Sequence, residues 1–139
     1  MELTLGQKSG TAAPSRGRLV GSWALSGLVI LFLLFDGTIK LMNLPMVREA
    51  TAQLGYPVDT IPVMAALVLG CTLLYAIPRT SVLGAVLLTG YLGGAVATHL
   101  RHSDPLFSHI LFPVYVGVMA WGGLYLREPR LQALLPLRK

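Results

Sequence analysis

The sequence of 139 residues contains one cysteine and few charged or aromatic side chains. Cys71 has no second thiol with which to form an intramolecular disulfide, a CxxC redox pair or a cysteine metal cage. The glycine-rich dinucleotide loop, the Walker loop and the HExxH zinc motif do not occur. These absences favour a protein without a catalytic centre of its own, and no cofactor is evident from a motif.

Charge is scarce, and apolar residues are abundant. Only 12% of the residues are charged, whereas 54% are hydrophobic and stand in long blocks. Such blocks are typical of membrane-spanning helices, so the lipid bilayer is the expected partner. The eleven basic residues exceed the six acidic ones, but they lie at the ends of the apolar blocks. This placement indicates membrane topology and argues against a nucleic-acid-binding surface.

Four apolar blocks are long enough to cross a membrane as helices. They run from about 19 to 44, 61 to 77, 81 to 100 and 105 to 126. Pro45 to Gly55 lies between the first two blocks and is amphipathic and too short to span. The predicted fold is an all-α integral membrane four-helix bundle with one short amphipathic interfacial helix. The expected parts are a basic, disordered cytoplasmic leader (1–18), a transmembrane domain (19–127) and a short basic cytoplasmic tail (128–139).

Basic residues gather on one side of the predicted membrane. Eight of the eleven fall there: Lys8, Arg16, Arg18, Arg79, Arg127, Arg130, Arg138 and Lys139. Lys40, Arg48 and Arg101 fall toward the other side. Because cytoplasmic loops are enriched in Lys and Arg, both termini are predicted to be cytoplasmic.

Small residues recur along the third span at helical spacing. Gly90 and Gly94 are four residues apart, as are Gly93 and Ala97. In lipid, this spacing permits the close backbone approach on which helix association depends. These four residues are therefore predicted to serve helix packing, either within the bundle or in self-association.

Polar side chains gather in the half of the bundle away from the basic residues. Asp36 and Lys40 are four residues apart and face each other on one helix, while Tyr91 and His99 lie on another. Ionisable residues inside a span are costly and indicate a functional site by default. We predict a ligand site at these four residues, although the acid–base pair could instead only orient its helix.

The three histidines and Arg101 allow more than one interpretation. His99 suits a proton relay or a partner for a quinone headgroup, or it is simply a polar residue at the membrane boundary. No metal site is expected, because His99, His102 and His109 fall on different faces and in a loop. Arg101 is expected to reach lipid headgroups in preference to binding a substrate, although it could hold Asp104 or an anionic ligand. Pro113 predicts a kink near His109.

Several stretches together resemble the DoxX-like family of small bacterial membrane proteins. They are FDGTIKLMNLP, LGYP, IPRTSVLGAVLLTGYLGGAVATHLR, DPLF and LREPRLQALLP, and the resemblance covers Leu34 to Leu135. It implies a four-helix bundle in the bacterial cytoplasmic (inner) membrane and a link to quinone-dependent redox complexes. The family's motif residues correspond here to Gly37, Lys40, Leu54, Gly55, Pro57, Gly90, Tyr91, Gly93, Gly94 and His99. Related families often carry an acid in the second span, where this chain has uncharged Leu69 to Thr72.

Three functions remain open from the sequence. The first is a non-catalytic subunit or anchor of a membrane redox complex, with redox partner subunits and a quinone held near Lys40, Tyr91 and His99. The second is a standalone binding or carrier module for a small amphipathic molecule. The third is a structural protein that self-associates as a homo-oligomer through its glycine stripe.

Overall fold

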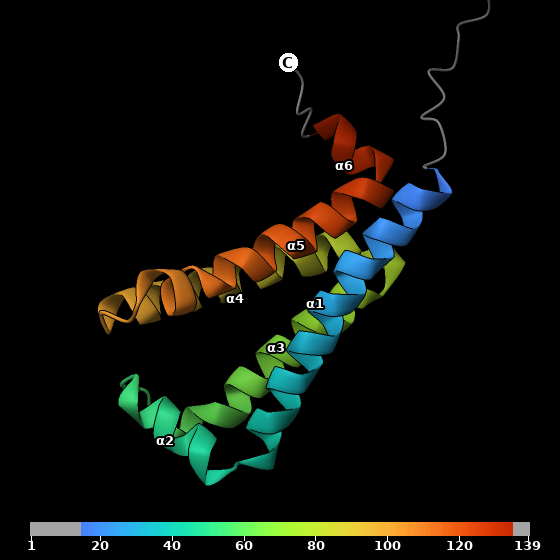
Figure 1. Ribbon diagram of the computed structural model, residues 1–139. Coiled ribbons are helices and arrows are strands. Elements are labelled where there is room, and N and C mark those ends of the chain that lie inside the picture. Colours follow the sequence, from blue (N-terminus) through green and yellow to red (C-terminus); the bar gives the residue numbers. More distant parts are fainter. Residues whose placement is uncertain (1–14, 135–139) are drawn as a thin grey trace, which may run out of the picture.

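The computed structural model describes residues 15–134, which are helical almost throughout (Figure 1). The elements are α1 (Arg16–Met42), α2 (Pro45–Gln53), η1 (Val58–Thr60), α3 (Ile61–Ala76), η2 (Pro78–Thr80), α4 (Ser81–Arg101), η3 (Leu106–Ile110), α5 (Phe112–Arg127) and α6 (Pro129–Leu134). Of these, η3 is a π-helical turn, whereas η1 and η2 are 3-10 turns. The predicted all-α fold is confirmed.

Four segments in the described part of the chain are long and apolar enough to cross a membrane. They are Arg16–Met42, Val58–Ala76, Pro78–Arg101 and Leu106–Arg127, so the four predicted spans are confirmed and the protein is a multi-pass membrane protein. The short helix predicted between the first two spans is α2.

The two ends of the transmembrane region differ in detail from the prediction. The first helix begins at Arg16, because the Ser15 hydroxyl accepts a hydrogen bond from the Arg18 amide at 3.2 Å and caps it. Disorder predicted over 1–18 is therefore wrong for 16–18, while 1–14 lie outside the described residues. The tail predicted from residue 128 includes α6, and 135–139 again lie outside the described residues.

The four long helices form a ring in which α1 contacts α3 and α5, and α4 contacts the same two helices. Figure 1 shows them converging where α1 begins and α5 ends, and diverging toward α2 and η3. We call the convergent end the basic end, because Arg16, Arg18, Arg79, Arg127 and Arg130 lie there. The divergent end is the open end.

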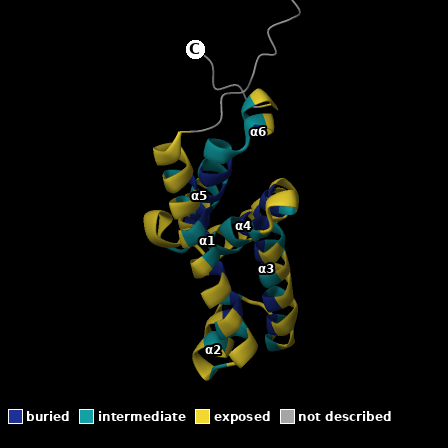
Figure 2. Ribbon diagram, turned by 90° about the vertical axis from the view of Figure 1, so that its right-hand side faces the viewer, coloured by how far each residue is buried: buried dark blue, intermediate teal, exposed yellow. Residues whose placement is uncertain are grey.

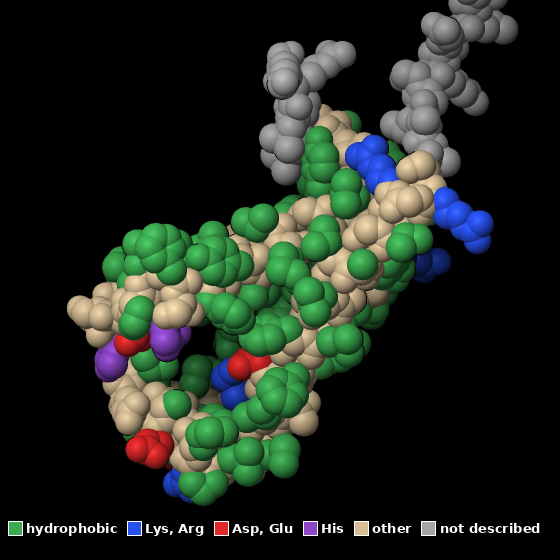
Figure 3. Space-filling model, viewed as in Figure 1, with side chains coloured by type: hydrophobic (Ala, Val, Ile, Leu, Met, Phe, Trp, Pro, Cys, Tyr) green, Lys and Arg blue, Asp and Glu red, His purple; other side chains and the backbone are tan. Residues whose placement is uncertain are grey.

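Figure 2 shows that much of each long helix is exposed, and Figure 3 shows hydrophobic side chains over the outside of the bundle. Leu31 is 68% exposed, Phe35 64% and Val118 66%. A soluble monomer rarely carries an apolar surface of this extent, so the outer faces of these helices suit lipid. Inside the ring, Val29, Leu33, Val68, Leu88 and Leu124 form the core.

Buried polar side chains join the helices at the basic end. The Ser22 hydroxyl donates to the carbonyl of Gly123 at 2.6 Å, which links α1 to α5. The Tyr75 hydroxyl accepts from Ser26 at 2.8 Å and donates to the carbonyl of Ala120 at 2.6 Å. One phenol thus joins α1, α3 and α5, and Tyr75, Ser22 and Ser26 are fully buried.

Arg127 completes this network from the last turn of α5. Its guanidinium donates to the hydroxyls of Ser22 and Ser26. It also lies over the Trp23 ring, with its central carbon 4.2 Å from the ring centroid. We call Ser22, Ser26, Tyr75 and Arg127 the basic-end network. Its hydrogen bonds pair the three hydroxyls and Nη1 of Arg127, which would be costly if left unpaired between apolar helices. Nη2 of Arg127 is buried without a partner among the described residues.

The closest helix contacts involve other glycines than those of the predicted stripe. A Cβ on Gly84 would lie 2.2 Å from the Tyr75 amide nitrogen, and one on Gly123 would lie 2.5 Å from the Ser26 hydroxyl. Within the described chain, nothing lies within 4 Å of a Cβ at Gly90, Gly93 or Gly94, and Ala97 is exposed. Gly37 of α1 also packs closely, but against the Leu69 side chain. The approach of one helix backbone to another therefore occurs at Gly84 and Gly123, at the basic end.

This difference makes a matched pair of substitutions in one helix informative. Gly84→Ala is expected to lower the free energy of unfolding by about 1–3 kcal/mol, because α3 and α4 must separate. Gly90→Ala meets no atom and should leave stability unchanged or raise it by up to about 1 kcal/mol through helix propensity. Thermal or denaturant unfolding in detergent measures both. Equal losses in the two variants would contradict the proposed contact.

Candidate functional site

The divergence of the helices leaves a cleft of about 440 Å³ at the open end. Figure 3 shows it as a hollow with acidic, basic and histidine side chains at its walls. Residues from α1, the α2–η1 connection, α3, α4 and α5 line it. Most of this lining is apolar, as with Phe32, Leu33, Met64 and Val116. Pockets of this volume and character are typical of small-molecule sites.

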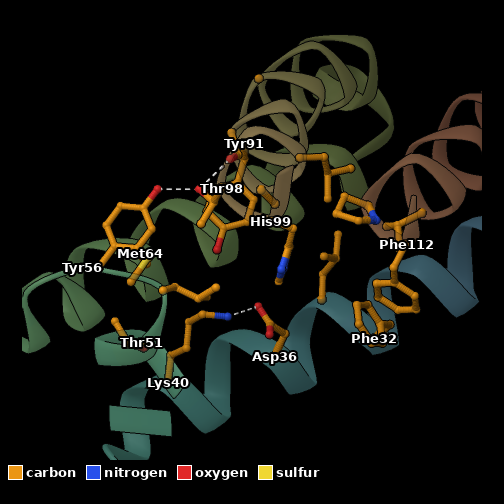
Figure 4. A pocket seen from close by; sticks show the side chains of 18 residues that line it. Phe32, Asp36, Lys40, Thr51, Tyr56, Met64, Tyr91, Thr98, His99 and Phe112 are labelled. Carbon is orange, nitrogen blue, oxygen red and sulfur yellow. Dashed lines mark hydrogen bonds and ion pairs between the residues drawn. The ribbon is translucent and has the colours of Figure 1, made fainter. Parts of the chain in front are cut away.

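All four residues of the predicted ligand site line this cleft. Asp36 and Lys40 come from α1, whereas Tyr91 and His99 come from α4. Figure 4 shows the two α1 side chains opposite those from α4. Helices α1 and α4 are not neighbours in the ring, so these groups face each other across the cleft.

Asp36 and Lys40 form an ion pair along α1, as their spacing predicts. The Lys40 side chain is mostly buried and that of Asp36 is partly exposed. Both residues line the cleft, so a ligand in it can reach the hydrogen-bonding atoms that their ion pair leaves free. A ligand oxygen near Lys40 would meet a charged donor that is already neutralised by its neighbour, which limits the cost of holding the charge in the bundle.

A carboxylate in the loop that follows α4 positions the His99 side chain. Its Nδ1 lies 2.6 Å from Oδ2 of Asp104, and Nδ1 of His102 lies 2.8 Å from the other carboxylate oxygen. These two hydrogen bonds, that from His99 first, lower the pKa of Asp104 below its ordinary 3.8. The carboxylate therefore accepts and both imidazoles donate. This role for Asp104 was not predicted from the sequence.

The π-helical turn η3 brings a second imidazole against His99. The amides of Ile110 and Leu111 bond to the carbonyls of Pro105 and Leu106, five residues earlier. Helix α5 then restarts with Pro113 in its first turn. This break is the kink predicted near His109, and it sets the rings of His99 and His109 edge to face, with centroids 5.8 Å apart.

The end of α2 closes one side of the cleft by two hydrogen bonds to α4. The hydroxyls of Tyr56 and Thr98 lie 2.6 Å apart, and Arg101 donates to the carbonyl of Leu54 at 2.9 Å. We call these bonds the α2–α4 contact. The expectation that Arg101 would hold Asp104 is wrong, because Asp104 takes both histidines and Arg101 turns toward Leu54.

Gly55 makes this contact possible. Its φ of +86° lies in the left-handed region, which side chains other than glycine rarely adopt. A Cβ there would also come within 3.1 Å of the Arg101 guanidinium. The glycine turns the chain after α2 so that the Leu54 carbonyl and the Tyr56 ring both face α4.

The contribution of Arg101 can be measured in the motion of α2. Replacing it by methionine removes one hydrogen bond of about 1 kcal/mol, so amide exchange over 45–56 should accelerate by about fivefold. Arg48→Met removes the same charge from an exposed position on α2 and serves as the control. Hydrogen–deuterium exchange with mass spectrometry reports both variants. Unchanged exchange in Arg101→Met would show that the contact does not restrain α2.

Comparison with known proteins identifies the family of the chain. Residues 24–123 match the DoxX-like family, which is most of the chain and includes every residue of the predicted ligand site. No curated protein and no solved structure matches the chain. The chain belongs to the DoxX-like family.

Proposed function

We propose that this DoxX-like protein binds a small amphipathic molecule in the open-end cleft, as a non-catalytic subunit or anchor of a quinone-linked redox complex in the membrane. The observation that supports it is the convergence of Asp36, Lys40, Tyr91 and His99 on one otherwise apolar cavity of about 440 Å³. Ionisable groups in a membrane bundle carry a cost that a functional site explains.

The lining suits a quinone in particular. A quinone headgroup is flat and apolar on its faces, and it carries carbonyl oxygens at its edges. Lys40 supplies a donor from one wall and His99 a polar imidazole nitrogen from another, while Phe32, Met64 and Phe112 supply apolar surface. The protein would bind and orient the headgroup, and a partner subunit would supply the redox chemistry. The four polar side chains include no activated nucleophile, which favours this division of roles.

A standalone carrier is the second candidate, and the side opening of the cleft favours it (Figure 3). A structural, self-associating role is the third. It is favoured by a shallow apolar groove between α4 and α5, lined by Gly93, Gly117 and Trp121 among others, next to the exposed Gly94 and Ala97. Recovery of the native complex from the source membrane would separate these roles, because only the first requires redox partner subunits.

We further infer that the basic end faces the cytoplasm of a bacterial inner membrane. Five of the eight basic residues assigned to that side lie at one end of the described structure, namely Arg16, Arg18, Arg79, Arg127 and Arg130. Lys40, Arg48 and Arg101 lie at the open end. The positive-inside rule then places the cleft toward the outer leaflet.

Quinone binding by the purified protein tests the proposal. Lys40→Met should weaken binding of a decyl-substituted benzoquinone, and His99→Ala should weaken binding of its hydroquinone, each by about tenfold to a hundredfold, because each variant lacks a side chain that hydrogen-bonds the ligand. Arg79→Met removes a cation from an exposed turn at the basic end and should bind as the wild type does. Equilibrium dialysis or fluorescence quenching in detergent gives the dissociation constants. Unchanged binding in both cleft variants would overturn the proposed site.

A further inference from the structure

The two nitrogens of His99 have different surroundings. Nδ1 lies 2.6 Å from Oδ2 of Asp104, whereas no hydrogen bond of Nε2 is found among residues 15–134. His99 lines the cleft, and its side chain is 23% exposed. Figure 4 shows it projecting from α4 into the cavity, across from Asp36 and Lys40. Nε2 is therefore the nitrogen that a ligand can reach.

Asp104 determines what Nε2 can do. An ionised carboxylate only accepts hydrogen bonds, so it keeps a proton on Nδ1 of His99. The lowered pKa of Asp104 keeps it ionised throughout the range in which an imidazole titrates. Nε2 then has no proton when His99 is neutral and carries one when His99 is an imidazolium. The first state accepts a hydrogen bond, and the second donates one.

We propose that Asp104 acts as a positioning residue that makes His99 a pH-dependent selector between two forms of the bound headgroup. Neutral His99 accepts from a hydroxyl and so prefers a hydroquinone, whereas protonated His99 donates to a carbonyl and so prefers a quinone. This inference rests on the proposed function, because it requires that the cleft bind such a headgroup. It adds which chemical form is favoured and which residue outside the cavity controls the choice.

Several other titratable groups face His99 and also influence its charge. The His109 ring packs against it from η3, and Tyr91 lies on the same helix. Asp36 and Lys40 face it from α1 as a neutralised pair, and Tyr56 faces it from the α2–η1 connection. His102 bonds to the other carboxylate oxygen of Asp104. Of the two acids Asp36 and Asp104, the one bonded to the His99 imidazole is Asp104. Its removal should therefore change the selectivity more than removal of an exposed acid elsewhere.

Binding of one probe pair at two pH values tests the inference. The ratio of dissociation constants for a decyl-benzoquinone and its hydroquinone, measured without oxygen, should change by about tenfold between about pH 5 and about pH 8. The quinone should gain at low pH and the hydroquinone at high pH. Asp104→Asn should reduce this change, because an amide can donate to Nδ1 as well as accept from it and so no longer keeps the proton of neutral His99 on that nitrogen. Asp59→Asn removes the same charge from an exposed turn at the open end and should keep the wild-type profile.

His99→Gln provides the second variant, because glutamine can donate and accept but does not titrate. It should bind both probes with a ratio independent of pH, which a purely structural role for His99 would not produce. Absence of binding by either probe at any pH would overturn the proposed function together with this inference. Binding by the wild type with a constant ratio, or a profile that Asp104→Asn leaves unchanged, would overturn this inference alone.

Discussion

The basic-end network is the constraint on which the rest of the structure depends. Arg127, Ser26 and Tyr75 form a continuous chain of hydrogen bonds that ends at the Ala120 carbonyl. In lipid, helices gain little from burying apolar surface against each other, because the tails are equally apolar. Close packing and internal hydrogen bonds therefore hold the bundle together. Both are concentrated at this end, where Gly84 and Gly123 also permit the closest backbone approach.

The cleft follows from this uneven distribution. Helices that are held closely together at the basic end diverge toward the other end, as Figure 1 shows. The ring arrangement keeps α1 and α4 apart, so a cavity separates their polar side chains. Each charged group still has a local partner: Lys40 has Asp36, and His99 has Asp104. The site can therefore exist in a membrane without a ligand, at a limited cost.

Much of the fold could be predicted, because the membrane imposes a simple rule on sequence. A span needs a long apolar block, and the four blocks correspond closely to the four helical segments. The grouping of Asp36, Lys40, Tyr91 and His99 in one cavity also followed from the sequence. Charges within spans are rare, and the order of the helices places these four at the same end.

The basic-end network could not be predicted from the same rules. Serines in an apolar helix give no signal of their partners, so Ser22 and Ser26 looked like ordinary small residues. Tyr75 is a single aromatic residue near a helix end, where headgroup contacts are the usual expectation. The glycine stripe was conspicuous for its spacing, but spacing does not say whether another helix lies opposite. The partner of Asp104 was also missed, because the left-handed turn at Ser103 that redirects the loop has no signature in the sequence.

The distribution of contacts also makes the molecule mechanically uneven. The basic end is stiff, because backbone contacts and a branched hydrogen-bond chain resist any change in the distance between helices. At the open end, two hydrogen bonds of about 1 kcal/mol each join the chain after α2 to α4. The deformation that meets the least resistance is therefore a rotation of the α1–α3 pair against the α4–α5 pair about the basic end. Such a motion would change the width of the cavity mouth while leaving the core undisturbed.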